Sequence, residues 1–293
     1  MSRRYAVVDV FTAVPLKGNP VAVVLDAAGL SDADMQATAA WTNLSETTFV
    51  LPANDPRASY RLRIFTPASE LPFAGHPTLG SAHAILAAGI AAPREGRLVQ
   101  ECGMGLVDLA VAGDGQLELK LPTATFKEIT AADLAEVEAA LGGRAQASSK
   151  PAAVHVGPTW LILPMESAAA VRALNPDMAR LAAIERRLGI TGVTAFGPHP
   201  PGAPAAIEVR SFAPSGGVPE DPVCGSGNGC VAAFRLARGM IGAESSYVAA
   251  QGACLNRAGR VAVRIAADGG IWLGGVCVTV VEGALRLRAG PAG

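Results

Sequence analysis

Short runs of apolar and β-branched residues, separated by turns that contain glycine or proline, recur along the chain and predict β-strands. The first two runs, 5–12 and 20–25, flank a Lys-Gly-Asn turn at 17–19. Later runs of similar character predict strands at 47–51, 57–65, 98–101, 105–111, 116–121, 261–265, 271–275 and 276–281. A large part of the chain is therefore expected to form sheet.

Helical patterns lie between these runs. Ser31 is the expected N-cap of a helix that continues through Trp41. The segment 77–89 is apolar on nearly all faces, with His83 as its main polar interruption, and a helix of that kind is buried. The segment 227–240 repeats this theme and gains two arginines only in its last turns, as a helix C-terminus prefers. A sheet curled around one central helix is the expected architecture.

The chain contains an internal repeat at an offset of 147 residues. Five residues of one segment recur in the same order in another: Arg63, Phe65, Pro67, Pro72 and Gly80 match Arg210, Phe212, Pro214, Pro219 and Gly227. The register continues outwards through two further pairs, Thr47 with Thr194 and Phe49 with Phe196. Each copy runs from a β-rich approach through a Pro/Gly turn into an Ala/Gly-rich helix. The repeat predicts two related lobes.

We therefore predict an α+β fold of two pseudo-symmetric lobes, each a curled mixed β-sheet or barrel around a central helix. The N-terminal lobe is expected at 1–125 and the C-terminal lobe at 151–293, with the option that the last strands cross into the first lobe. Between them, 126–150 holds a helical pattern at 131–141 followed by two glycines, and reads as the connection. The two turn-to-helix junctions can face one cleft, where free N–H groups suit an anionic ligand.

Composition narrows the choice of partners. The 293 residues are 50% hydrophobic, and 24 basic and 25 acidic residues give a formal charge of −1 without long blocks of one sign. This distribution argues against binding of nucleic acid or an anionic membrane and leaves a small-molecule ligand. Five cysteines without a CxxC pair fit a reducing compartment, and Asp9 interrupts the only apolar run that could begin a signal peptide. A cytoplasmic protein is expected.

The sequence shows no motif for a metal or a nucleotide cofactor. Its four histidines are scattered and form no HExxH or Cys/His cluster. The glycines at 225–229 lack the GxGxxG spacing of a dinucleotide site and the lysine of a phosphate-binding loop. We therefore expect chemistry without a cofactor.

Three polar residues stand out as candidates for that chemistry. Glu46 lies between a helix end and a strand start, where a carboxylate is either a solvated loop acid or a catalytic group near a cleft. His76, in a Gly-His-Pro turn, can cap the turn or hydrogen-bond a substrate oxygen. Asp221 precedes a helix start, a position typical of an N-cap. By contrast, His83 is expected to be a satisfied internal histidine.

Several segments together resemble the PhzF family of phenazine biosynthesis, which shares its fold with diaminopimelate epimerase. The segments that carry the resemblance are 8–12, 18–20, 43–50, 65–80, 220–227, 251–252 and 259–260, so that it covers nearly the whole chain. The resemblance implies a homodimer and a cofactor-independent isomerase. It also implies that Glu46 is the acid/base that moves a proton from carbon to carbon, for which an apolar environment should raise its pKa.

The same resemblance assigns roles to residues at both helix starts. It implies that His76 lies in the substrate pocket and that Asp221 contacts an amino or hydroxyl group of the substrate. Ser226, with the amides of Gly225 and Gly227, is implied to hold a substrate carboxylate, and Gly75 is the equivalent of these glycines in the first lobe. Glycine suits such a place because it lets the backbone approach a ligand closely.

Cys224 is a further candidate, because it replaces the threonine associated with this position in many family members. In the related epimerases and proline racemases, two facing thiols act on opposite sides of one carbon. At the 147 offset Cys224 matches Pro77, and no cysteine lies within 75–80. A cysteine-based racemase or epimerase therefore ranks below the glutamate isomerase. A non-catalytic small-molecule binding or interaction protein on the same scaffold stays open as the alternative.

Overall fold

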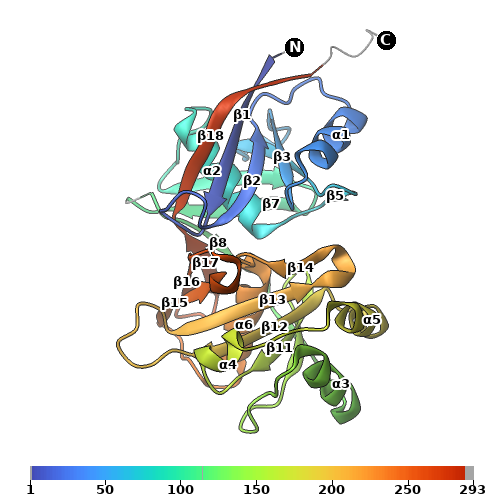
Figure 1. The fold of residues 1–293 in the computed structure, drawn as a ribbon. Coiled ribbons are helices and arrows are strands. Elements are labelled where there is room, and N and C mark those ends of the chain that lie inside the picture. Colours follow the sequence, from blue (N-terminus) through green and yellow to red (C-terminus); the bar gives the residue numbers. More distant parts are fainter. Residues whose placement is uncertain (1, 114, 288–293) are drawn as a thin grey trace. The chain divides into compact units, whose positions relative to one another are not determined.

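The computed structural model describes residues 2–113 and 115–287, which form two compact units (Figure 1). The first unit contains the chain up to Leu119 together with the C-terminal segment from Gly274, and the second contains Lys120–Leu273.

The first unit is a mixed sheet with two helices. Its strands are β1 (Ser2–Val10), β2 (Asn19–Val24), β3 (Thr47–Leu51), β4 (Tyr60–Phe65), β5 (Glu70–Leu71), β6 (Arg97–Cys102), β7 (Gly105–Val111), β8 (Leu117–Lys120) and β18 (Cys277–Arg286). Along the sheet, β18, β1 and β2 pair antiparallel, β2 and β3 parallel, β3 and β4 antiparallel, β4 and β6 parallel, and β6, β7 and β8 antiparallel. The small strand β5 pairs with β4.

The helices of this unit are α1 (Asp32–Thr42) and α2 (Gly75–Ala87). Ser31 caps α1 as predicted: its Oγ accepts a hydrogen bond from the N–H of Asp34, and the Asp34 carboxylate accepts one from the N–H of Ser31. Helix α2 packs against β1, β2, β3 and β18 and is buried along most of its length, which confirms the predicted central helix. At Gly80 a Cβ would lie 2.4 Å from Cγ1 of Val21, so only glycine fits this contact.

The second unit repeats the same pairing scheme. Its strands are β9 (Thr125–Glu128), β10 (Ala152–His155), β11 (Thr159–Pro164), β12 (Gly192–Pro198), β13 (Ile207–Ala213), β14 (Val218–Asp221), β15 (Ser246–Gln251), β16 (Gly259–Ile265) and β17 (Ile271–Gly275). Strands β9, β10 and β11 pair antiparallel, β11 and β12 parallel, β12 and β13 antiparallel, β13 and β15 parallel, and β15 and β16 antiparallel. Strand β14 pairs with β13, as β5 pairs with β4.

The described part of this unit has four α-helices: α3 (Ala131–Leu141), α4 (Ala168–Arg172), α5 (Met178–Leu188) and α6 (Gly225–Ala237). It also has two short 3-10 helices, η1 (Pro214–Gly216) and η2 (Ala253–Leu255). Helix α6 packs against β10, β11 and β12, the strands equivalent to β1, β2 and β3 around α2, and also against β16. The second unit is therefore also a curled mixed sheet around one helix.

The internal repeat is confirmed, but its register is not constant. Arg63 forms a bidentate ion pair with Glu70 and lies 5.1 Å from the ring centroid of Phe65. Arg210 makes the same contacts with Glu220 and Phe212. The two arginines are 147 positions apart, whereas the two glutamates, at 70 and 220, are 150 apart. Three residues are thus inserted in the second hairpin, where η1 lies and Gly217 takes a φ of +84°.

This insertion corrects three of the predicted matches, the first being Pro72, which corresponds to Pro222 and not to Pro219. Helices α2 and α6 begin 150 positions apart, so Gly227 corresponds to Pro77 and not to Gly80. Cys224, the N-cap of α6, corresponds to Ala74, the N-cap of α2, and not to Pro77. The segment 126–150, which was expected to connect the lobes, lies within the second unit, because β9 pairs with β10 and α3 contributes Val137 and Leu141 to its core.

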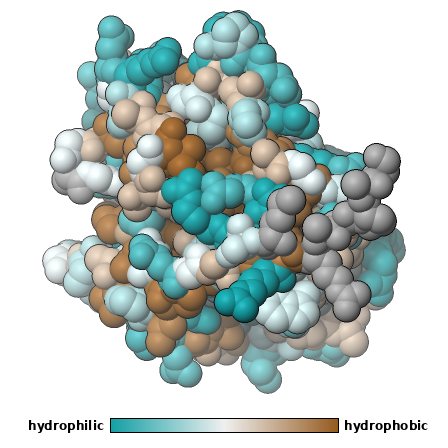
Figure 2. All heavy atoms as spheres, turned by 90° about the horizontal axis from the view of Figure 1, so that it is seen from above, coloured by the Kyte–Doolittle hydropathy of each residue, from teal (hydrophilic) through white to brown (hydrophobic). Residues whose placement is uncertain are grey.

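The chain's last strand belongs to the first unit, since β18 pairs with β1 from Ser2 to Val10. Among the described residues, no helix is both long and apolar enough to cross a membrane. On the face seen in Figure 2, polar and apolar residues are interspersed, and neither kind covers the face alone.

Candidate active site

Glu46 lies in the loop between α1 and β3, as the sequence predicted. Asn43 ends α1 in a left-handed conformation, with φ of +54°, and turns the chain towards β3. The hydroxyl groups of Thr42 and Thr47 then meet across the loop at 2.7 Å. The carbonyl of Glu46 accepts a hydrogen bond from the N–H of Ala22 in β2, which fixes its backbone beside the parallel β2/β3 pair.

The carboxyl group of Glu46 is mostly buried, with 16% of the side chain exposed. Burial raises its pKa from 4.5 to about 7, although a hydrogen bond with Ser45 opposes the rise. Its Oε2 atom lies 3.2 Å from Nε2 of His76, and no described residue gives this oxygen a well-aligned hydrogen bond. A carboxyl group with this pKa populates both protonation states near neutral pH, as an acid/base catalyst requires.

His76 and Gly75 form the first turn of α2. The N-cap of this helix, Ala74, offers no side-chain hydrogen bond, and the first turn contains no acidic residue. The first N–H groups of a helix have no partner within the helix itself, so this end of α2 suits an anionic or polar ligand. A Cβ on Gly75 would meet only Leu119, at an ordinary 3.8 Å. Packing among the described residues therefore does not explain a glycine at this position.

His83, on the same helix, was expected to be a satisfied internal histidine, and the structure agrees. Its Nε2 lies 3.0 Å from the hydroxyl of Thr279 in β18, and burial lowers its pKa. It is a packing residue of the first unit.

The second group of predicted residues lies in the turn from β14 to α6. Asp221 ends β14, and its Oδ1 accepts a hydrogen bond from the N–H of Val223. It does not cap α6, because Cys224 holds the N-cap position and its Sγ accepts from the N–H of Gly227 at 3.2 Å. The Gly227 amide, predicted to contact a ligand, thus already has a partner, and the amides of Gly225 and Ser226 are left at the helix start.

Two residues of this site were not identified as functional from the sequence. Trp160 of β11 donates its indole N–H to Oγ of Ser226 at 2.9 Å. Gln251 of β15, which is 1% exposed, accepts hydrogen bonds from the N–H of Cys224 and from the side chain of Asn228, and donates to the carbonyl of Asp221. The Gln-Gly pair at 251–252 was a signal for this role, whereas nothing in the sequence around Trp160 pointed to Ser226.

Cys224 is buried, and burial raises the pKa of its thiol well above 9.0, with the nearby Asp221 acting in the same direction. The thiol is therefore protonated at neutral pH and is a poor base. Its counterpart in the repeat is Ala74, which has no thiol. The corrected register thus still gives no pair of equivalent cysteines.

The structure brings the predicted residues together in two groups. Glu46, Gly75 and His76 form the first group, within the first unit. The second group lies at one turn of the second unit and consists of Asp221, Cys224, Gly225, Ser226 and Gly227.

Comparison with known proteins agrees with this fold. This chain is an α+β protein of duplicated β-sheet units, each around a central helix. A crystal structure of a PhzF-family phenazine biosynthesis protein from Bacillus anthracis matches its fold with a TM-score of 0.86. That match has 23% identity and covers 98% of this chain and 100% of the other. Residues 8–283 match the family model described as phenazine biosynthesis-like protein.

Two curated relatives are more similar in sequence. One, trans-2,3-dihydro-3-hydroxyanthranilate isomerase from Pseudomonas aeruginosa, is 40% identical over 241 residues, which is 80% of each chain. The other, antisense-enhancing sequence 1 from Schizosaccharomyces pombe, is 39% identical over 287 residues, covering 94% of this chain and 96% of that protein. The chain belongs to the PhzF-type isomerase family.

Proposed function

We propose that this isomerase needs no cofactor and uses Glu46 to move one proton between two carbons of a small substrate that bears a carboxylate. The observation that carries the proposal is the buried Glu46 carboxyl group, whose pKa is about 7 and which lies 3.2 Å from His76 at the uncapped start of α2. A solvated loop acid, the alternative reading of this residue, would keep a pKa near 4.5.

In the proposed reaction the Glu46 carboxylate takes a proton from one carbon, and the electron pair left behind shifts along the substrate. The neutral acid then returns the proton to a second carbon, so the enzyme ends in its starting state and needs no co-reactant. Burial lowers the cost of the neutral intermediate form of Glu46. His76, beside Oε2 of Glu46, is proposed to hydrogen-bond the substrate and orient it to this carboxyl group.

The second group of residues is proposed to bind the substrate carboxylate. Trp160 fixes Oγ of Ser226 by donating to it, and the same oxygen lies 3.6 Å from Sγ of Cys224. The Ser226 hydroxyl proton is proposed to turn to an anionic oxygen of the substrate. The amides of Gly225 and Ser226 at the α6 N-terminus add donors and a positive dipole end. Asp221 is proposed to accept a hydrogen bond from a substrate amino or hydroxyl group, and Cys224 to support the turn rather than react.

The relative named for trans-2,3-dihydro-3-hydroxyanthranilate suggests the first substrate to assay. That compound offers a carboxylate, an amino group and a hydroxyl group, which match the donors and the acceptor proposed above. We also propose a homodimer, which sedimentation of the purified chain tests directly.

Turnover in deuterated water tests the proposed reaction. Wild type should convert the substrate and leave solvent deuterium at carbon, whereas Glu46→Gln should lose both by about 10²- to 10⁴-fold. Glu185→Gln is the matched control, because Glu185 of α5 is also a buried carboxyl group with a raised pKa, but it accepts a hydrogen bond from the N–H of Ser215. Full exchange by Glu46→Gln would refute the role of Glu46.

The alternative, a binding or interaction protein on this scaffold, has one observation in its favour. A relative that covers 94% of this chain, antisense-enhancing sequence 1, does not carry the name of an enzyme. Small carboxylates that stabilise the protein against heat would be incubated with it and recovered. A tight ligand that is recovered unchanged, without deuterium at carbon, would favour this alternative.

A further inference from the structure

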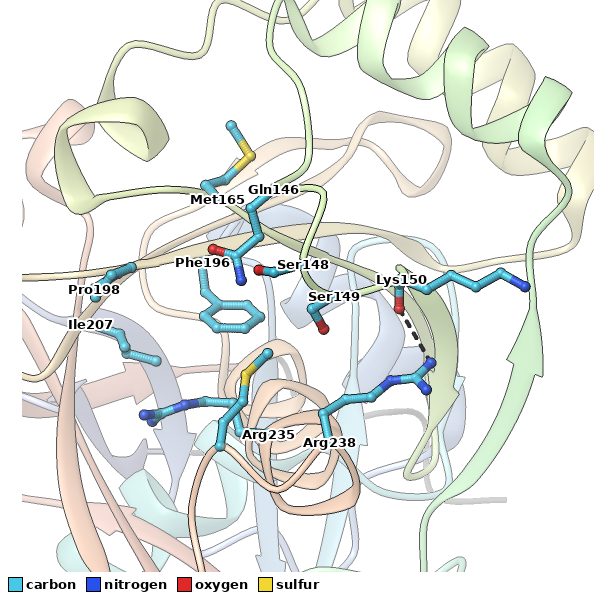
Figure 3. Close-up of a pocket in the computed structure, with 11 residues that line it drawn as sticks. Gln146, Ser148, Ser149, Lys150, Met165, Phe196, Pro198, Ile207, Arg235 and Arg238 are labelled. Atoms are coloured by element: carbon cyan, nitrogen blue, oxygen red, sulfur yellow. Dashed lines mark hydrogen bonds between the residues drawn. The ribbon is translucent and has the colours of Figure 1, made fainter.

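A cavity of about 510 Å³ lies in the second unit at the C-terminal end of α6. Its polar lining comes from the segment before β10 and from the end of the helix: Gln146, Ser148, Ser149, Lys150, Arg235 and Arg238. Figure 3 shows the serines and Gln146 on one segment, with the two arginines reaching from the helix end and Phe196 between them. Residues 221–227 are at the other end of α6, about 20 Å away for a helix of this length.

The charged groups that line this cavity are all cations. Lys150 forms an ion pair with the exposed Glu128 at 2.7 Å, which compensates its charge. Arg238 donates one hydrogen bond to the carbonyl of Lys150 at 3.2 Å and keeps further N–H donors. Arg235 lies over the ring of Tyr247, with its Cζ atom 4.2 Å from the centroid. No acidic residue belongs to the described lining, and Glu128, which lies outside it, attracts Arg238 as well as Lys150.

Stabilisation of the helix end accounts for cations in the last turn of α6, but not for a buried donor nearby. The hydroxyl of Ser149, a residue that is 8% exposed, has no hydrogen-bond partner among the described residues. Arg235, by contrast, interacts with the hydroxyl of Tyr247 as well as with its ring. Buried polar atoms are nearly always hydrogen-bonded in folded proteins, so the Ser149 hydroxyl needs a partner inside the cavity.

The remaining walls are apolar. Phe196 and Ile207 are 4% and 2% exposed and form part of the cavity lining, which Met165, Pro198 and Met240 complete. An apolar cavity of a few hundred Å³ with a few polar groups converging on one side is the usual form of a small-molecule site. Inorganic ions alone would leave this apolar side unused.

We propose that this cavity is a second ligand site, which binds a small organic anion. The anionic group accepts hydrogen bonds from Ser149 and Arg238, and the apolar body of the ligand lies against Phe196 and Ile207. Arginine suits this role because its planar donors match a carboxylate or a phosphate. The site is independent of the proposed isomerisation, since none of its residues belongs to the candidate active site.

The test uses the full-length protein with methionine methyl groups labelled for NMR. Benzoate and phenyl phosphate are the anionic probes, and benzamide is the neutral counterpart of benzoate. Either anion should shift the Met240 resonance saturably, while Met178 of α5 and Met35 of α1 stay in place. Benzamide should bind at least about tenfold more weakly, because it cannot form charge-assisted hydrogen bonds. The tighter of the two anions identifies a carboxylate or a phosphate site.

Variants separate this cavity from the candidate active site. Arg238→Gln and Ser149→Ala should weaken anion binding, the first by about tenfold or more, whereas Arg180→Gln on the exposed face of α5 and Ser226→Ala should not. If a variant does not fold, the Met240 shift in wild type still decides. Two results would overturn the proposal: no saturable Met240 shift below about 10 mM of either anion, or equal affinity for benzamide and benzoate.

Discussion

Oε2 of Glu46 lies 3.2 Å from Nε2 of His76, although the two residues come from different elements of the first unit. Glu46 precedes β3, and His76 is the second residue of α2. In the second unit, the position equivalent to Glu46 holds Val193 and the position equivalent to His76 holds Ser226. The scaffold therefore occurs twice in the chain, and the Glu46–His76 pair once.

This relationship predicts the pH dependence of the reaction. Proton abstraction needs the Glu46 carboxylate, so kcat/KM should rise with pH and level off above about 7. Because burial is the main cause of the raised pKa, His76→Asn should lower kcat/KM but leave the midpoint of its rise with pH near 7. A midpoint that moves to about 4.5 in His76→Asn would show that the histidine, and not burial, sets the pKa of Glu46.

Glu46 also makes stability depend on pH. Its pKa is higher in the folded state, about 7, than in the unfolded state, near 4.5, so the free energy of unfolding falls as pH rises between these values. Glu46→Gln removes this loss. The free energy of unfolding of the variant, measured relative to wild type, should therefore be larger at pH 8 than at pH 4, by at most about 3 kcal/mol. Urea unfolding at both pH values measures it.

A second glutamate supplies the control of opposite sign. Glu101 accepts hydrogen bonds from the backbone of Asn54 and Asp55, and these lower its pKa. Glu101→Gln should therefore lose stability relative to wild type as pH rises. The same sign for both variants would contradict the account of Glu46.

Two glycines of α2 are expected to respond differently to alanine. Gly80→Ala places a methyl group 2.4 Å from Cγ1 of Val21 and 2.9 Å from Cγ2 of Val10, so it should destabilise the protein by about 1–3 kcal/mol. Gly75→Ala finds space and should melt close to wild type, yet lose activity if the substrate approaches this backbone. Thermal melting and kcat/KM of both variants check this contrast.

Trp160→Phe is predicted to weaken substrate binding. The change removes the indole N–H that holds Oγ of Ser226 at 2.9 Å but keeps an aromatic ring in the same place. A single lost hydrogen bond of this kind raises KM by up to roughly tenfold. Trp41→Phe, at a site that is 76% exposed, is the control and should leave KM unchanged. Equal KM values for all three proteins would remove Ser226 from the proposed carboxylate site.

Cys224→Ala should retain proton exchange, because the raised pKa keeps the thiol protonated and Ala74 already serves as the equivalent N-cap of α2. In wild type, iodoacetamide should modify the exposed Cys254 long before Cys224. Inactivation that follows alkylation of Cys224, together with an active Glu46→Gln, would restore the racemase hypothesis.

Local sequence signals predicted the elements that position the first group of residues. Ser31 begins α1, the apolar segment around His83 forms the buried central helix, and Glu46 lies in the predicted loop. Helix α5 carried similar signals, Asp177 as its N-cap and Gly189 at its end, but it was not among the predicted elements.

Other features depend on contacts between distant residues. The indole of Trp160 reaches Ser226 across 66 positions, and no local pattern encodes such a contact. The three-residue insertion at η1 was hidden because Pro219 lies at the 147 offset from Pro72, although the hairpin register makes Pro222 the equivalent of Pro72. Only the strand pairing shows where the offset changes.

The most direct test of the central claim is an NMR titration of the Glu46 side chain. Proteins labelled with ¹³C at the glutamate carboxyl carbon would be titrated, and the Glu46 signal would be assigned by its absence in Glu46→Gln. The account predicts a midpoint near pH 7, well above the value of about 4.3 for a glutamate in a model peptide. A midpoint near 4.5 would contradict it, because Glu46 would then be an ordinary carboxylate that cannot return a proton to carbon at neutral pH.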